Sequence, residues 1–307
     1  MAIQWYPGHM FKASKEIKES LPLVDLVIEI IDARIPYSSQ NPALAQLRGE
    51  KPCIRILSKS DLADPEVTEQ WQTYLEQEKG VKTLALTTEE PEKLKRVTEL
   101  CLKLIPRENI AEKPVRALIM GIPNVGKSTL INILADRIIA KTGNEPAVTK
   151  NQQRIRLKAG VTLFDTPGVL WPKVHNDKSS YRLAATGAIK DTVVKYEEVA
   201  HFTLEYLMKT YPEYLKDRYD LADLPICAYE LMGMIGKRRG CLRAGGHIEM
   251  DKAAKIIIKE LRAGQLGRIT LETPTMMEEE LIQVAASIEA KALKDKERKE
   301  RRKKKFR

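Results

Sequence analysis

Residues 114–128 read PVRALIMGIPNVGKS, and this stretch decides the fold. An apolar run of strand type leads into Gly121-Ile-Pro-Asn-Val-Gly126-Lys127-Ser128, which matches G-x-x-x-x-G-K-[ST] in full. Between a strand and a helix, this motif is typical of a loop whose backbone N–H groups surround a phosphate. Lys127 adds a positive charge at the β- and γ-phosphates, and the Ser128 hydroxyl can ligate Mg²⁺. We expect nucleotide contacts from Asn124, Val125, Gly126, Lys127, Ser128 and Thr129.

A second phosphate motif follows downstream, where an expected strand ends in Phe164-Asp165-Thr166-Pro167-Gly168. The Asp165 carboxylate can hold Mg²⁺ through water, and Pro167 and Gly168 can bring a backbone N–H toward a γ-phosphate. Between the two motifs, Thr149 is the preferred second hydroxyl ligand of Mg²⁺ because of its distance from Asp165, with Thr142 as the alternative.

A base-reading loop is predicted earlier in the chain, where residues 56–62 read ILSKSDL. Asp61 can accept hydrogen bonds from the guanine N1–H and exocyclic amine, which adenine cannot supply. Lys59 can lay its aliphatic stem along the base. An isolated S-K-S-D is more often a solvated turn, but together with the phosphate motifs it predicts guanine.

The first 180 residues predict an α/β domain. Strands are expected at 25–31, 53–57, 81–86 and 114–120, and helices at 64–80 and 91–104. A hairpin is expected from 154–158 and 161–164. Strands alternating with helices of this length indicate a mostly parallel sheet flanked by helices.

Residues 181–289 predict a separate all-α domain. One expected helix places Val199, Phe202 and Tyr206 on its apolar face. A second has Asp251 as N-cap, an apolar stripe at 257, 258 and 261, and Gly264 after its end. A third begins at Pro274, with Met277, Leu281, Val284 and Ile288 on one side.

The positive charge of the chain is concentrated at its C-terminal end. Residues 290–307 contain 11 Lys or Arg and 3 Asp or Glu, while the whole chain of 307 residues has a net charge of +10. This composition predicts a disordered basic tail that binds RNA, with a merely solubilising tail as the alternative. No DNA partner is expected.

A second basic cluster lies in GMIGKRRGCLRAGGHIEMDK, where glycines surround Lys237, Arg238, Arg239 and Arg243. Clustered cations on a freely bending backbone suit the phosphates of RNA, and Lys255, Lys259 and Arg262 could extend the surface. Aromatic residues are scarce here, so RNA recognised by shape is favoured over stacked single strands. A solvated polar loop is the alternative.

Several classes of protein are disfavoured by composition. The four cysteines form no C-x-x-C pair and no zinc spacing, and Cys53 and Cys101 lie in apolar runs, so a reduced cytoplasmic chain with buried thiols is expected. The N-terminus lacks a signal-peptide pattern, and no apolar run is long enough to span a bilayer. We also expect a monomer.

The order Lys-x-Asp, P-loop, Thr, D-T-P-G resembles that of the circularly permuted GTPases. Within them, WYPGHM, IDARIP and GIPNVGKSTLIN resemble the ribosome biogenesis GTPase A family over nearly the whole chain before the tail. The resemblance implies a GTPase that assists maturation of the large ribosomal subunit and contacts ribosomal RNA. It also implies turnover that is slow alone and stimulated by the subunit.

The sequence departs from the family pattern in three places. Ser58 replaces the usual Asn of Asn-Lys-x-Asp, which removes an amide that normally holds the base loop, and Ala147 replaces a common Gly. The backbone contact to the guanine oxygen is assigned to Thr87 or Thr88, because LALTTEE lacks the usual Ser-Ala.

The residue that positions the attacking water is also unusual. Val169 stands where many small GTPases have Gln and offers no polar atom. His9 in WYPGHM is the candidate, because the permutation brings the N-terminal segment beside the switch and an imidazole can orient water. The alternative is a packing or RNA-contact segment in which His9 acts as a cap. Asn124 resembles the potassium ligand of cation-stimulated relatives, with a simple loop cap as the alternative.

The permuted order has a mechanical consequence. The segment after D-T-P-G leads directly into the helical domain, so we expect GTP and GDP to present that domain differently. Two other functions compete with this reading: another P-loop NTPase, and an RNA-binding scaffold whose nucleotide site is structural.

Overall fold

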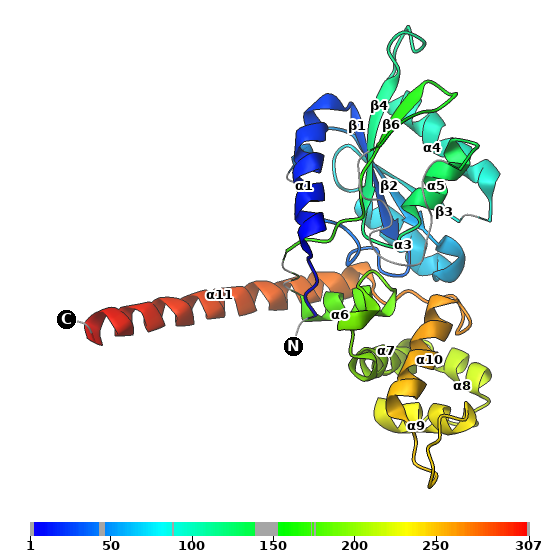
Figure 1. Ribbon diagram of the computed structural model, residues 1–307, viewed down its shortest axis with the longest axis vertical. Coiled ribbons are helices and arrows are strands. Elements are labelled where there is room, and N and C mark those ends of the chain that lie inside the picture. Colours follow the sequence, from blue (N-terminus) through cyan, green and yellow to red (C-terminus); the bar gives the residue numbers. More distant parts are fainter. Residues whose placement is uncertain are drawn as a thin grey trace.

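The computed structural model describes residues 3–42, 47–87, 89–138, 153–172, 174 and 176–305. An α/β domain lies above a group of helices, and the long helix α11 (Pro274–Lys305) starts at their junction and projects to one side (Figure 1). The N-terminal segment also reaches this junction, beside α6 (Asp177–Ala185).

The α/β domain is built on a six-stranded sheet of order β3-β2-β1-β4-β6-β5, in which only β5 is antiparallel to its neighbour. The strands are β1 (Leu26–Asp32), β2 (Cys53–Ser58), β3 (Val81–Leu86), β4 (Val115–Gly121), β5 (Gln153–Arg156) and β6 (Val161–Asp165). All seven residues of β1 are buried, as expected for a central parallel strand covered on both faces. The predicted α/β class and mostly parallel sheet are confirmed.

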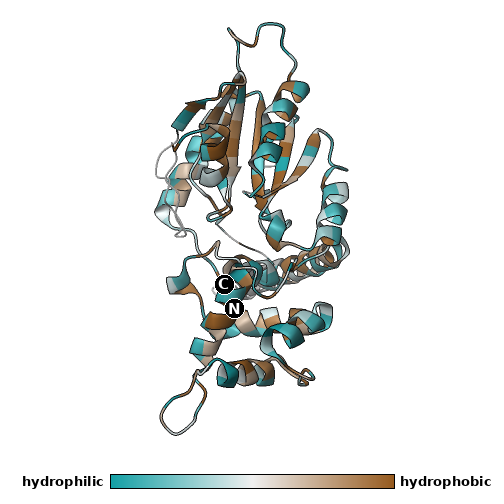
Figure 2. Cartoon of the chain, turned by 90° about the vertical axis from the view of Figure 1, so that its right-hand side faces the viewer, coloured by the Kyte–Doolittle hydropathy of each residue, from teal (hydrophilic) through white to brown (hydrophobic). Residues whose placement is uncertain are grey.

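Helices cover both faces of the sheet. Figure 1 shows α1 (Gly8–Ser20) on one side and α4 (Pro91–Leu104) and α5 (Lys127–Leu134) on the other. Figure 2 shows hydrophobic residues concentrated along the strands between these layers. The predicted N-cap Asp64 accepts hydrogen bonds from the N–H groups of Glu66 and Val67 at the start of α3 (Pro65–Leu75).

The helical domain contains α6, α7 (Tyr196–Thr210), α8 (Pro212–Tyr219), α9 (Ala228–Arg238) and α10 (Met250–Arg262). The apolar stripe predicted on α10 is confirmed, since Ile257, Ile258 and Leu261 are buried. The predicted N-cap Asp251 is wrong: α10 begins at Met250, after Glu249, and Asp251 instead pairs with Lys255.

The buried face of α7 also differs from its prediction. Val199, Ala200, Thr203, Leu204 and Leu207 are buried, while Phe202 and Tyr206 are only half-buried. The physical reason is that α7 packs against α6, α9 and α10 together, so its buried face is wider and rotated. Phe202 stacks instead on Tyr181, with ring centroids 5.2 Å apart.

Helix α11 departs from the sequence analysis at both ends. Near its start, Met277 is fully buried against Trp71 and Leu75 of α3, so residues assigned to the helical domain also pack on the α/β domain. At its end, the backbone stays helical to Lys305, where a disordered tail was expected. Ala, Lys, Arg and Glu favour helices, and no Gly or Pro follows Pro274.

The two cysteines predicted to be buried are buried. Burial raises the pKa of the Cys53 and Cys101 thiols to about 12, so both remain protonated at neutral pH. Among the described helices, none combines the length and apolar character that crossing a bilayer requires.

Candidate nucleotide site

The phosphate loop connects β4 to α5, as its motif predicts. Gly126 immediately precedes α5 with a φ of 92°, a left-handed conformation that favours glycine. Gly121 lies so close to β1 that a Cβ there would be 2.6 Å from the carbonyl oxygen of Ile30. The predicted contact residues Val125, Ser128 and Thr129 are all on this loop and the first turn of α5, whose N-terminus favours anions.

The D-T-P-G segment packs directly on this loop. A Cβ at Gly168 would lie 3.0 Å from the backbone N and Cα atoms of Pro123, so a larger residue there would push the two segments apart by a few tenths of an ångström. The next N–H, that of Val169, donates to the Gly121 carbonyl over 3.1 Å. The Val169 side chain is buried and therefore cannot orient a water molecule.

Lys127 and Asp165 form a buried ion pair. The Lys127 ammonium lies 2.7 Å from Asp165 Oδ1, and the two side chains are 6% and 0% exposed. Burial raises the pKa of Asp165, and Lys127 opposes this shift. The pair compensates two charges that would otherwise be costly to bury, at a position where a γ-phosphate could compete for the ammonium.

The same carboxylate fits a magnesium role. Asp165 Oδ2 is buried and makes no hydrogen bond within the described part of the chain. The Ser128 hydroxyl is half-buried on the first turn of α5. An unpaired carboxylate oxygen and a hydroxyl are ligands that Mg²⁺ accepts, directly or through water. Thr149 and its alternative Thr142 lie outside the described residues.

The base loop follows β2 and contacts the phosphate loop. The Ser58 hydroxyl lies 2.7 Å from the Val125 carbonyl, so it can link the two loops despite the absence of the family's Asn. Lys59 has a φ of 56°, and its ammonium donates to the Asn124 carbonyl at 2.8 Å and to Asp32 Oδ2 at 2.9 Å. Burial lowers the pKa of Lys59, and Asp32 opposes this shift.

Asp61 remains available for a ligand. It lies on the short 3-10 helix η2 (Ser60–Leu62), is half-buried, and forms no hydrogen bond or ion pair within the described part of the chain. Thr87 is buried at the end of β3, where its hydroxyl accepts from the N–H of Glu89. Thr88 lies outside the described residues, so the choice between the two stays a prediction.

Sequence reasoning missed a second set of contacts that holds the base loop. The segment 263–273, which joins α10 to α11, runs along this loop. Arg268 donates to the carbonyls of Ala63 at 3.0 Å and Ser60 at 3.1 Å, and the Ile269 N–H donates to the Leu62 carbonyl at 2.9 Å. These bonds lie on both sides of Asp61. No local pattern could reveal them, because Arg268 is separated from its acceptors by 205 and 208 residues.

The N-terminal segment contacts the chain that follows D-T-P-G. The Gln4 amide both donates to the Val174 carbonyl at 3.0 Å and accepts from the Val174 N–H at 3.2 Å. His9 is exposed near the start of α1, with its ring centroid 6.3 Å from that of Trp5. The cap of α1 is Pro7 with no side-chain hydrogen bond, so the alternative of a capping His9 is not supported.

Asn124 connects the phosphate loop to the helical domain. It has a left-handed φ of 58°, and its amide donates to the Gly187 carbonyl at 2.8 Å. Gly187 follows α6, which is the first helix after the D-T-P-G segment. The bond therefore joins the nucleotide site directly to the helical domain.

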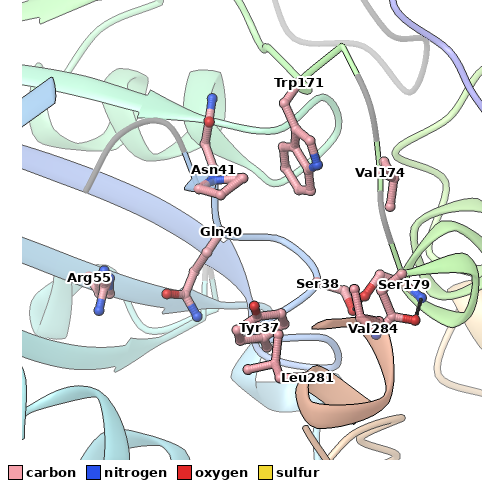
Figure 3. Close-up of a pocket in the computed structure, with 12 residues that line it drawn as sticks. Tyr37, Ser38, Gln40, Asn41, Arg55, Trp171, Val174, Ser179, Leu281 and Val284 are labelled. Carbon is pink, nitrogen blue, oxygen red and sulfur yellow. Dashed lines mark hydrogen bonds between the residues drawn. The ribbon is translucent and has the colours of Figure 1, made fainter. Parts of the chain in front are cut away.

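An apolar pocket of about 250 Å³ lies beside the chain leading from D-T-P-G to α6. Trp171 and Val174 face Tyr37 and the α11 residues Leu281 and Val284 across it (Figure 3). Two predicted apolar positions of α11 therefore line the junction between domains, while Ile288 is 44% exposed.

The basic loop of the helical domain forms a short hairpin between α9 and α10, closed by a bridge between Leu242 and Ile248 (Figure 1). Arg243 is exposed on this hairpin. Lys237 is exposed on the last turn of α9, where Arg238 is 46% exposed in a pair with Asp220. Arg262 does not extend this surface, because it turns inward and donates to the carbonyls of Ala184 and Ala185.

Together, the sheet order and the three loops define a P-loop GTPase in which the base loop precedes the phosphate loop. The family model described as "50S ribosome-binding GTPase" matches residues 116–226. Ribosome biogenesis GTPase A of Bacillus pumilus is 46% identical over 281 residues, covering 89% of this chain and 99% of that protein. The chain belongs to the ribosome biogenesis GTPase A family and is a GTPase.

Two further similarities agree with this assignment. The crystal structure of GNP-bound YlqF from T. maritima covers 86% of this chain and 98% of its own, with a TM-score of 0.64 and 26% identity. The mouse protein named mitochondrial ribosome-associated GTPase 1 is 38% identical over 215 residues, 66% of this chain and 65% of that protein. The permuted fold expected from motif order is thereby confirmed.

Proposed function

We propose that this GTPase is an assembly factor for the large ribosomal subunit. It would bind ribosomal RNA through the helical domain and the basic C-terminal end. One observation carries the proposal: Asn124 of the phosphate loop bonds to Gly187, and Arg268 and Ile269 bond to the base loop. The same hydrogen bonds therefore hold the loops of the nucleotide site and the helical domain that carries the proposed RNA surface. The names of the relatives, which refer to ribosome biogenesis and to 50S binding, support the choice of partner.

The RNA surface would use exposed cations rather than aromatic stacking. The exposed cations are Lys237 at the end of α9, Arg243 on the hairpin, and Lys255 and Lys259 on α10. Salt-dependent contacts to the phosphates of folded RNA suit this arrangement, and the C-terminal end adds further charge. A cytoplasmic location and a monomeric state remain predictions from the sequence.

Magnesium would be held by Ser128, Asp165 and Thr149, and it would neutralise charge on the β- and γ-phosphates. Potassium would bind at the side-chain oxygen of Asn124, near the phosphate loop. Equal hydrolysis rates in potassium and sodium buffers would remove the potassium role.

His9 would orient the attacking water. Its support is that Val169 is buried and that Gln4, five residues before His9, bonds to the chain following D-T-P-G. The second candidate function, an RNA-binding scaffold with a structural nucleotide site, is favoured by Ser58 in place of the family's Asn and by the absence of a polar side chain at Val169.

Turnover separates these functions. We would measure hydrolysis of GTP and ATP in potassium buffer, with and without purified large ribosomal subunits. The assembly-factor proposal predicts GTP-selective turnover that rises with subunits. GTP turnover indifferent to subunits would remove the large subunit as the partner, and absence of turnover would favour the scaffold.

The His9→Ala variant then tests the water role. We expect subunit-stimulated turnover to fall by at least about a hundredfold, because a positioned acid–base group contributes about 10²–10⁴ in rate, while GTP affinity stays constant. His201→Ala is the matched control, since His201 lies on α7 of the helical domain. Unchanged stimulated turnover in His9→Ala would end this assignment.

A further inference from the structure

A cavity of about 600 Å³ separates the base-loop side of the α/β domain from the helical domain. Among the described residues, its lining includes one carboxylate, that of Asp191, and five basic side chains. The basic residues are Arg34, Lys59, Lys190, Lys259 and Arg262. Lys59 and Asn124 also belong to the nucleotide site, but Asp61 and Gly126 do not line the cavity. It is therefore a neighbouring space that shares two residues with the nucleotide site.

The deep cations of this cavity are fixed by their own partners. Arg34 and Lys59 both pair with the buried carboxylate of Asp32. Arg262 pairs with Asp191 and donates to the carbonyls at the end of α6. These side chains are pre-arranged, and their excess positive charge remains in a partly enclosed space.

The cations at the rim differ. Lys190, in the loop after α6, and Lys259, on α10, are exposed, and neither forms an ion pair or side-chain hydrogen bond within the described part of the chain. Both line the cavity from the helical domain. Two unpaired ammonium groups above fixed guanidinium groups are the arrangement that phosphate groups favour.

We propose that this cavity binds a phosphoryl group, with Lys190 and Lys259 as its direct ligands. The cavity is within the size range of small-ligand pockets and can admit a diphosphate or one phosphodiester unit of an RNA strand. The RNA source rests on the proposed function, whereas a free phosphate or diphosphate does not. A bound anion would contact Lys59 and Asn124 from outside the nucleotide site, so its binding would be linked to that of GTP.

Inorganic pyrophosphate is the first probe. It is titrated by calorimetry into the full chain saturated with GDP, so that the phosphate loop is already occupied. Lys190→Glu/Lys259→Glu should weaken binding by about tenfold or more, because two attractive charges become repulsive. The control Lys209→Glu/Lys252→Glu makes the same charge change on α7 and α10 at exposed positions that do not line the cavity, and should bind as the wild type does.

The second arm identifies the source of the phosphate. Binding to large ribosomal subunits is measured over a series of potassium chloride concentrations with a nonhydrolysable GTP analogue. If RNA supplies the phosphate, the negative slope of log affinity against log salt should become shallower by about 1–2 in the cavity variant relative to the control variant. Lost pyrophosphate binding with an unchanged slope assigns the cavity to a free anion.

One combination overturns the proposal: no difference between cavity and control variants in either arm. Both variants must retain wild-type basal GTP turnover, which shows that they are folded. Failure of wild-type GTP turnover would contradict the proposed function, but it would leave the pyrophosphate titration of the GDP-bound chain interpretable.

Discussion

We propose that single side chains determine which base this site accepts, and Asp61 is the clearest case. It is half-buried and forms no hydrogen bond or ion pair within the described part of the chain. The nearby Lys59 ammonium, by contrast, donates hydrogen bonds to Asp32 and to the Asn124 carbonyl. A carboxylate held in this way can accept two hydrogen bonds from guanine. We therefore expect the choice of base to rest on Asp61, whose surroundings hold it in position.

Asp61→Asn should reverse the base preference. The amide would meet the guanine amine donor with a donor of its own, and we expect affinity for GDP to fall by about a hundredfold or more. Affinity for xanthosine diphosphate should rise, because xanthine has a carbonyl at that position. Fluorescent-nucleotide titration measures both constants. Asp220→Asn, at an exposed residue of the helical domain, should change neither. Equal losses for both nucleotides in Asp61→Asn would contradict this role.

Asp32 is a second single residue on which the folded site depends. It is 2% exposed and accepts hydrogen bonds from the Arg34 guanidinium and the Lys59 ammonium. Burial alone would raise the pKa of Asp32, but Arg34 and Lys59 hold this pKa well below its usual range. The ionised carboxylate is thus an integral part of the folded site.

Asp32→Asn should lower the free energy of unfolding by about 3–5 kcal/mol at pH 7, because Arg34 stays buried without a counter-charge. A depressed pKa contributes stability above the unfolded-state value, so the difference from wild type should persist down to about pH 4 and shrink below it. Urea unfolding at several pH values measures both effects. A difference below about 1 kcal/mol at pH 7 would show that Arg34 finds another partner.

Among the elements, the base loop has an unusual dependence on a distant segment. Arg268 and Ile269 hold the carbonyls of Ser60, Leu62 and Ala63. The Ser58 hydroxyl is within reach of the carbonyls of Val125 in the phosphate loop and Ile31 in β1, but its single proton can be donated to only one of them at a time. The segment 263–273 therefore supplies support that the family's Asn would otherwise share.

Arg268→Ala should weaken GDP binding by about tenfold, because two charge-assisted hydrogen bonds around Asp61 are lost. Arg243→Ala removes an equally basic side chain from the distant hairpin and should leave GDP affinity unchanged. Titration with fluorescent GDP gives both constants. Equal affinities in the two variants would mean that the Ile269 N–H alone holds the loop.

The elements also show where sequence reasoning succeeds. The bounds of β3 and α4 match their predictions because local signals mark both ends, including Gly80 before the strand and Pro91 at the helix start. Local signals failed at Asp251, because the preceding hairpin fixes the helix start through a bond from the Glu249 N–H to the Cys241 carbonyl.

The residues of the candidate site also fall into those that local motifs predict and those that they do not. Motif spacing predicted Lys127, Asp165 and Asp61 as site residues, and the fold places all three at the carboxyl ends of parallel strands of one sheet. Asp61 follows β2, Lys127 begins the helix after β4, and Asp165 ends β6. The contacts of Gln4 and Arg268 join segments about 170 to 208 residues apart and obey no local periodicity. Only the three-dimensional path of the chain brings them to the site.

At the scale of the whole molecule, charge is carried far from the nucleotide site. The C-terminal end of α11 projects away from both domains (Figure 1). Deleting residues 290–307 should flatten the salt dependence of subunit binding and leave basal GTP hydrolysis unchanged, because the removed residues hold 11 basic side chains and none of the nucleotide motifs. Binding over a series of salt concentrations measures this, and an unchanged slope would show that the C-terminal end is not an RNA-binding arm.

The two domains are joined by bonds that a nucleotide can influence. The Ile269 N–H donates to Leu62 in the base loop, the Leu271 N–H donates to Arg34 after β1, and Asn124 bonds to Gly187. On the α/β side, Leu62 and Asn124 belong to the base loop and the phosphate loop, and Arg34 shares the Asp32 carboxylate with Lys59 of the base loop. A change in loop position between GTP and GDP would therefore alter these bonds first.

Hydrogen exchange should detect this coupling. We expect the amides of Ile269 and Leu271 to exchange at different rates with GDP and with a nonhydrolysable GTP analogue, because opening of their bonds exposes the N–H groups to solvent. Amides in the centre of β1, such as that of Ile28, are the internal control, because this strand is covered on both faces of the sheet. Identical protection over residues 181–289 in both nucleotide states would mean that the helical domain is presented unchanged, and that hydrolysis controls the partner through some other element.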